Sequence, residues 1–119
     1  MMLNPQDFVR PVARRVMDRK VYDTMTAVHV ASDWNGLARA DFRFREWDLF
    51  RTPRGNWFRV DSGGPLTDAR RWAGDGWTDT IEKVTPITPA DALAFLKVHG
   101  TPQLIEKYLP NRTDLEIAL

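Results

Sequence analysis

The residues that could carry acid–base, nucleophilic or metal chemistry are few in this chain and widely spaced. It has no cysteine, and its two histidines, His29 and His99, lie far apart in the sequence. No spacing of histidine and carboxylate residues matches a metal site, and none joins a nucleophile to a base. We therefore predict a non-enzymatic protein without a metal or a cofactor. Any catalysis would depend on carboxylates that the fold brings together, such as Asp23, Asp33, Asp41 and Asp61.

Recognition chemistry is better represented, because tryptophan and arginine recur through the middle of the chain. Two alternating runs, 47–51 and 57–61, flank a turn sequence in which Pro53 presets a type I turn and Gly55 can take the positive φ that follows it. This hairpin would pair Arg51 with Trp57 and Phe50 with Phe58, and this register determines which side chains lie on each face. One face carries Phe50, Phe58 and Val60, and the other carries Trp47, Leu49, Arg51, Trp57 and Arg59.

The mixed tryptophan and arginine face of this hairpin is typical of an interaction surface, unless a helix covers it. The hairpin leads into a long irregular stretch, 62–79, that begins with two consecutive glycines and contains two more tryptophans. Consecutive glycines can form an anion-binding nest. The two tryptophans are predicted to pin the loop to the body, with a role as partner anchors as the alternative. The candidate partner-binding residues are Trp47, Arg51, Trp57, Arg59, Gly63, Gly64, Arg70, Arg71, Trp72 and Trp77.

Composition bounds the class of protein. At 119 residues, with 43% hydrophobic and 28% charged residues, the chain fits one globular domain, 1–119. No apolar run is long enough to cross a bilayer, and the N-terminus lacks the pattern of a secretory signal. We expect a cytoplasmic protein that does not bind membranes.

The net charge of +1 hides an uneven distribution along the chain. Residues 1–71 have 13 Lys and Arg against 9 Asp and Glu, whereas residues 72–119 have 4 against 7. The basic first part makes nucleic acid the alternative to a protein partner, although the small net charge argues against it. The arginines that would contact phosphates are Arg10, Arg14, Arg15, Arg43, Arg45, Arg51 and Arg59.

The elements that must position these residues are mostly strands, followed by helices. Residues 13–24 form either a small hairpin that turns at Asp18-Arg19, which we favour, or a basic helix. Strands are expected at 26–32, 41–50 and 81–84, with a possible bulge near Arg45-Glu46, and a short helix is possible from Pro5. Thr88-Pro89 and Thr101-Pro102 each begin a helix, the first ending near Gly100 and the second at Pro110.

These expectations define an α+β fold. An antiparallel sheet of four or five strands would carry a C-terminal helix pair on one face. Residues 1–19 would form an N-terminal extension, 20–84 the sheet and its loop, and 88–109 the helices.

Several short motifs follow one another in the order Tyr22-Asp23-Thr24, Leu49-Phe50-Arg51-Thr52, Gly55-Asn56-Trp57-Phe58 and Gly63-Gly64-Pro65. This order resembles a family of small uncharacterised proteins often carried by bacterial phages and conjugative elements. The resemblance implies a mobile-element context, in which small proteins include inhibitors of host defence, CRISPR inhibitors among them. We predict a protein-interaction module, plausibly an inhibitor of a host defence complex, with a nucleic-acid-binding accessory protein as the alternative.

Overall fold

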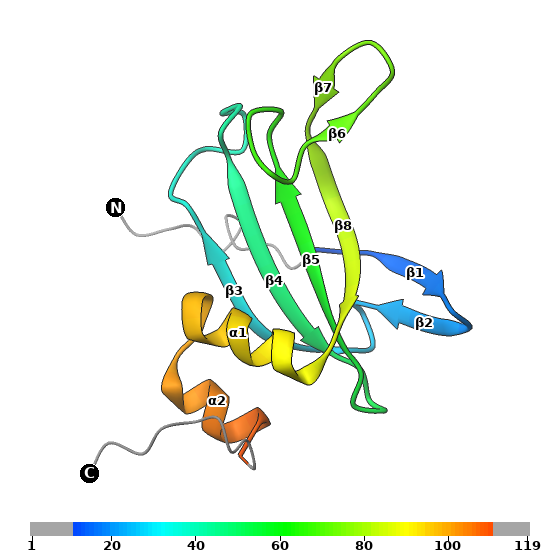
Figure 1. Cartoon of the computed structure of the whole chain (residues 1–119), viewed down its shortest axis with the longest axis vertical. Coiled ribbons are helices and arrows are strands. Elements are labelled where there is room, and N and C mark those ends of the chain that lie inside the picture. The colour runs from blue at the N-terminus through cyan, green and yellow to red at the C-terminus, as the bar shows by residue number, and fades with distance from the viewer. Residues whose placement is uncertain (1–10, 111–119) are drawn as a thin grey trace.

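The computed structural model describes residues 11–110, except for the side chains of Thr80 and Ile81. Strands β3, β4, β5 and β8 form one antiparallel sheet in that order, and β1–β2 and β6–β7 are separate two-stranded hairpins (Figure 1). With two helices packed on the sheet, the predicted α+β class is confirmed. The elements are β1 Arg14–Met17, β2 Lys20–Asp23, β3 Val28–Trp34, β4 Arg45–Arg51, β5 Trp57–Gly63, β6 Arg71–Trp72, β7 Trp77–Thr78, β8 Thr80–Ile87, α1 Pro89–His99 and α2 Pro102–Tyr108.

The β4–β5 hairpin lies at the centre of the sheet and has the predicted register. Arg51 pairs with Trp57 and Phe50 with Phe58. The N–H of Gly55 donates to the carbonyl of Thr52 at 2.9 Å, and Gly55 has φ +88°, as the turn chemistry requires.

Both faces of the central hairpin are covered, each by a different layer. Leu49 and Trp57 pack with α1 and α2, in a core that includes Leu93, Phe95 and Leu96. Phe50 and Phe58 alternate with them, so they face the other way, where Tyr22 of β2 meets Phe58 edge-on at 5.5 Å. The sheet therefore separates two apolar cores.

The two helices begin where the sequence predicts. The hydroxyl of Thr88 accepts the N–H of Asp91, and the Asp91 carboxylate accepts the N–H of Thr88, which completes a capping box. Thr101 caps α2 in the same way through the N–H of Leu104. Gly100 ends α1 with extended backbone rather than the left-handed conformation typical of this position, and a Cβ there would meet Leu96.

Strand β3 differs from the predicted alternation because it contains a bulge between His29 and Ala31. The bulge leaves both Val30 and Ala31 against the helices, while the His29 ring stacks on Phe50 at 4.7 Å on the opposite face. Regular alternation along the expected strand, 26–32, predicts that His29 and Ala31 share a face, and the bulge makes this prediction wrong.

The hairpin expected at 13–24 is present as β1–β2. Asp18 and Arg19 form its two-residue turn, with φ of +54° and +64°. Strand β4 starts later than expected, at Arg45, and continues without a bulge, so that Glu46 and Asp48 share the face of Phe50. The helix considered from Pro5 lies outside the described residues.

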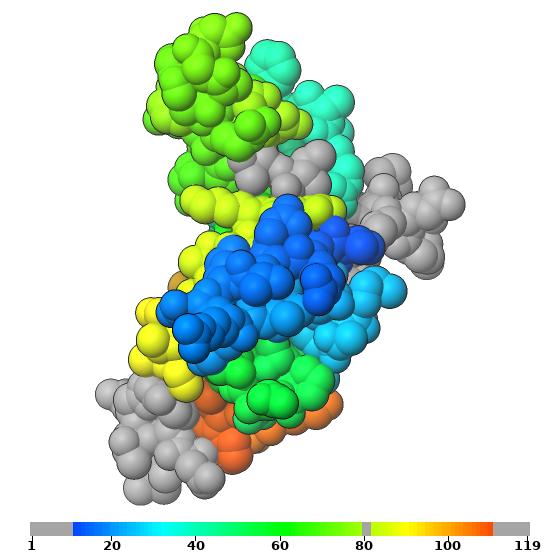
Figure 2. Space-filling view, turned by 90° about the vertical axis from the view of Figure 1, so that its right-hand side faces the viewer, coloured from blue at the N-terminus to red at the C-terminus, as the bar shows by residue number. Residues whose placement is uncertain are grey.

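The stretch expected to be irregular contains a further hairpin. Strands β6 and β7 pair Trp72 with Trp77 and Arg71 with Thr78. This hairpin stands clear of the sheet at one end of the molecule, opposite the β4–β5 turn, and the side view shows it as a separate projection (Figures 1 and 2).

Candidate functional site

The ten predicted partner-binding residues divide into three groups with different surroundings. Trp47, Arg51, Trp57 and Arg59 lie on the helix-covered face of the sheet, Gly63 and Gly64 lie at the end of β5, and the other four belong to the β6–β7 hairpin or its base. Only the third group is exposed throughout. The buried and half-buried groups hold the fold together.

Trp57 is corrected from a surface residue to a core residue. Its side chain is only 3% exposed, because α1 and α2 cover this face of the hairpin. The predicted stacking of Arg51 on Trp57 does occur, with the guanidinium carbon 5.4 Å from the ring centroid. It takes place at the edge of the core, where Arg51 is half-buried.

The other two residues of this face are also engaged inside the protein. Trp47 is half-buried and stacks on the ring of His99 at 4.5 Å, while the guanidinium of Arg45 lies 4.8 Å from its centroid. Arg59 donates two hydrogen bonds of 2.8 Å to the carboxylate of Asp61. Neither side chain is free to anchor a partner.

Gly63 and Gly64 do not form an anion nest. Both are buried, and neither has a positive φ. The N–H of Gly64 donates to the carbonyl of Phe44 at 2.9 Å, so it is not available to a ligand. A Cβ at Gly64 would overlap the backbone of Phe42, and one at Gly63 would meet Thr67. Close approach of two chain segments is what requires these glycines.

An ion-pair network centred on the buried Arg45 lies at the base of the β6–β7 hairpin. Arg45, 6% exposed, donates from Nη2 to Asp61 at 2.8 Å and from Nε to Asp68 at 2.7 Å. The Arg45 hydrogen bond holds the pKa of the Asp68 carboxyl below its usual range. Sequence reasoning missed this network because its partners lie 16 and 23 residues from Arg45.

The β6–β7 hairpin presents an aromatic and cationic surface. Trp72 and Trp77 are 57% and 51% exposed, and their rings meet edge-on, with centroids 5.3 Å apart and an interplanar angle of 73°. The guanidinium carbon of Arg70 lies 4.1 Å from the Trp77 ring, and Arg71 is exposed beside it. The expectation that the tryptophans pin the loop to the body is wrong, since neither belongs to a buried core.

This hairpin was missed because its strands have only two residues each. A signal for it is nevertheless present. Trp72 and Trp77 flank a short sequence with Gly74 and Gly76, and Gly74 has φ +95° in the turn. A cross-strand aromatic pair closing a glycine-containing loop is typical of a hairpin.

A second polar cluster lies on the sheet face opposite the helices. The Nε2 of His29 and an Oδ1 of Asp48 are 2.7 Å apart, and Arg39 donates to Glu46 at 3.0 Å. Burial, together with the charge of Asp48, raises the pKa of Glu46 to about 7. The Oδ2 of Asp48 is buried and has no hydrogen-bond partner among the described residues.

The carboxylates first considered for catalysis have structural partners instead. Asp33 binds the Nδ1 of His99 at 2.7 Å, and Asp61 binds Arg45 and Arg59. Asp23 and Asp41 pair with Arg14 and Arg43, at 4.0 and 3.7 Å.

Four of the seven arginines expected to contact nucleic acid have a carboxylate within 4.0 Å, whereas Arg15 and Arg51 form no ion pair in the described residues. Arg14, Arg43, Arg45 and Arg59 form ion pairs with carboxylates, and Arg10 lies outside the described residues. Within residues 11–110, no group of three or more His, Asp or Glu side chains could hold a metal ion. None of the helices in the same part of the chain is long and apolar enough to cross a membrane.

Comparisons with models of protein families, with curated proteins and with solved structures find no match to this chain. The resemblance to phage and conjugative-element proteins therefore remains a prediction from the sequence. The exposed aromatic hairpin, with Trp72 and Trp77 at its centre, is the candidate binding site that the geometry supports best.

Proposed function

We propose that this protein is a non-enzymatic interaction module that binds a protein partner through the β6–β7 hairpin. The observation that carries the proposal is the exposure of Trp72 and Trp77, at 57% and 51%, on a hairpin that projects from the body. Tryptophan and arginine are the residues most enriched among energetic hot spots of interfaces. Arg70 and Arg71 accompany the two tryptophans here.

The energetics of the hairpin favour a surface that is completed by another molecule. An aromatic side chain can bury about 150–250 Å². A tryptophan that stays half-exposed therefore lacks roughly 2–3 kcal/mol of the hydrophobic stabilisation that full burial would give. The edge-on contact between Trp72 and Trp77 holds both rings in place before binding. Such preorganisation lowers the conformational entropy that is lost when the partner binds.

The chemistry of the hairpin indicates the kind of surface that it fits. Two indole rings require an apolar depression, and the adjacent guanidiniums of Arg70 and Arg71 favour carboxylates at its rim. In the mobile-element context that the sequence resemblance suggests, the partner would be a protein of a host defence complex. The module would act in the cytoplasm by occupying the surface that this complex needs.

A capture experiment with matched variants tests the proposal. Tagged wild-type protein, the double variant Trp72→Ala/Trp77→Ala and the control Met25→Ala are each used to capture proteins from a lysate of the native host. Met25 is 66% exposed and lies on the segment between β2 and β3, away from the hairpin. We expect a partner that wild type and Met25→Ala retain equally and that the double variant loses. Equal capture by all three would show that the hairpin is not the binding site.

A further inference from the structure

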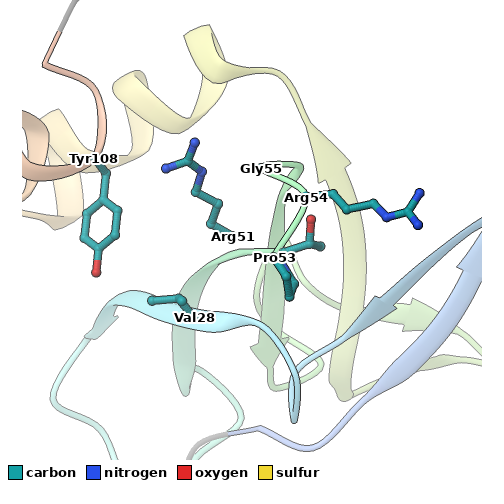
Figure 3. A pocket seen from close by; sticks show the side chains of 7 residues that line it. Val28, Arg51, Pro53, Arg54, Gly55 and Tyr108 are labelled. Carbon is teal, nitrogen blue, oxygen red and sulfur yellow. The ribbon is translucent and has the colours of Figure 1, made fainter.

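Two shallow concavities flank the β4–β5 turn, at the end of the molecule opposite the tryptophan hairpin. One, of about 370 Å³, lies between this turn, β3 and the end of α2, and includes Arg51 and Tyr108 (Figure 3). The other, of about 430 Å³, lies between this turn and the β1–β2 turn, and includes Arg19 and Lys20. Both share Thr52, Pro53 and Arg54, so they are adjoining parts of one surface.

This surface is basic because its cations are not neutralised. Arg19, Lys20, Arg51 and Arg54 form no ion pair with a carboxylate in the described part of the chain, in contrast to the paired arginines of the sheet. Lys20 makes one long hydrogen bond, 3.5 Å from Nζ to Asn56. Among the residues that the structure describes, no carboxylate side chain lines either concavity. Although the chain has a net charge of only +1, four cations without a carboxylate partner in the described residues lie around this one turn.

Arg51 has an unsatisfied hydrogen-bond donor at this surface. Its Nε is buried and has no hydrogen-bond partner among the described residues, a state that costs about 1–3 kcal/mol for an ordinary buried donor. The side chain is fixed against Trp57 and extends into the concavity toward Tyr108 (Figure 3). Nε itself is buried, so an anionic oxygen in this concavity would contact the accessible part of the half-buried Arg51 guanidinium.

The arrangement fits a chain of negative charges better than a single anion. Arg51 and Arg54 point to opposite sides of the turn, so one small ion cannot contact both (Figure 3). A phosphodiester backbone carries one charge per nucleotide and can cross the turn from one concavity to the other. The first concavity also offers the ring of Tyr108 beside Val28 and Pro53, an apolar surface for a base.

We propose that the β4–β5 turn binds single-stranded nucleic acid. Arg19, Lys20, Arg51 and Arg54 contact its phosphates, and Tyr108 contacts a base. The site is independent of the tryptophan hairpin and uses a different set of arginines from the ion-paired ones of the sheet. Binding depends little on base sequence, because the cations contact phosphates, which carry no sequence information, and Tyr108 contacts the face of a base.

The primary test is the salt dependence of binding to a labelled oligothymidylate of about 15 nucleotides, followed by fluorescence anisotropy. Four phosphate contacts predict a slope of log affinity against log salt of about −3, or roughly a 50-fold loss between about 50 and 200 mM NaCl. A matching duplex should bind at least several-fold more weakly. No binding at low salt would overturn the proposal. Stronger binding of the duplex, or equally strong competition by polyglutamate, would overturn the assignment to a single strand.

Charge-matched variants distinguish this site from general attraction. Arg19→Asn/Arg54→Gln should weaken binding roughly tenfold at low salt and halve the slope, since two of four contacts are lost. Asparagine at position 19 suits the positive φ of the turn. The control Arg15→Gln/Lys97→Gln removes the same charge from two exposed cations outside the concavities and should change affinity less than twofold. Equal losses in both double variants would refute a defined site.

The aromatic contact has its own test. Tyr108→Leu should weaken oligothymidylate binding severalfold but leave binding to inorganic polyphosphate unchanged, because polyphosphate has no base to stack. A thermal melt of the variant reports whether the fold persists, since Tyr108 also meets Trp57 edge-on. An equal loss for both ligands in a folded variant would show that Tyr108 does not contact a base.

Discussion

Two hairpins of this protein contain the same chemistry in opposite surroundings. In β4–β5, Arg51 stacks on Trp57, which is 3% exposed, and in the β6–β7 region Arg70 stacks on Trp77, which is 51% exposed. The first hairpin is covered on one face by helices and on the other by β1–β2. The second projects beyond the sheet (Figure 1). Residue type therefore does not decide whether such a pair stabilises the fold or is available to a partner.

The charges of the two hairpins differ in the same way. Arg45 and Glu46 of β4 are buried and bonded to other charged side chains, so their energetics belong to folding. Arg70 and Arg71 are exposed and form no ion pair in the described residues. The energy of a charged contact is available for binding only where the fold does not already use it.

The largest effect that we predict is on the buried tryptophan. Trp57→Ala should lower the free energy of unfolding by about 3–5 kcal/mol, because it empties the centre of the core between sheet and helices. Urea denaturation followed by circular dichroism measures this loss. A decrease below about 1 kcal/mol would mean that the helices do not pack on this face, and the contrast between the hairpins would fail.

The second prediction concerns the buried carboxyl of β4. The pKa of Glu46 is raised from 4.5 to about 7 in the folded protein, so protons bind more tightly to the folded state. Below about pH 4.5 the Glu46 carboxyl does not lower the free energy of unfolding. The loss of unfolding free energy grows as the pH rises to about 7 and is constant above that pH. The total loss is on the order of 3 kcal/mol. Glu46→Gln, which retains the neutral shape, should remove it.

The measurement is the difference in unfolding free energy between Glu46→Gln and wild type at about pH 4.5 and pH 8. The variant should become more stable relative to wild type as the pH rises. Arg39 and Asp48 can still form hydrogen bonds with the amide. His29, which is bonded to Asp48, is present in both proteins, so its contribution to the unfolding free energy largely cancels in the difference. Glu106→Gln, an exposed position on α2, is the control and should show no such trend. A trend of opposite sign would mean that Glu46 is ionised in the folded protein.

The smallest predicted effect is on the exposed pair. Trp72→Ala and Trp77→Ala should each change the free energy of unfolding by no more than about 0.5–1 kcal/mol, because the rings contact each other and Arg70 rather than a core. Thermal melts of the two variants beside Trp57→Ala provide the comparison. Destabilisation as large as that of Trp57→Ala would place the hairpin in the core and remove the basis of the proposed interaction surface.

Local features were predictable because a few neighbouring residues determine them. Pro53 and Gly55 determine the turn of the β4–β5 hairpin and, with it, the pairing of Arg51 with Trp57. Thr88 and Thr101 determine where the helices begin. The β6–β7 hairpin was missed because strands of two residues show no alternation, although the spacing of its two tryptophans indicated a pairing.

By itself, the sequence determined the hairpin register, the helix caps and the α+β class, because turn propensity, capping and side-chain alternation act over a few residues. Only the tertiary structure decided which tryptophans are buried, since burial depends on which distant layer covers a face. It also decided which charges are used in folding: Arg45 binds Asp68, 23 residues away, whereas Arg51 and Arg54 remain without carboxylate partners at the opposite end of the described structure.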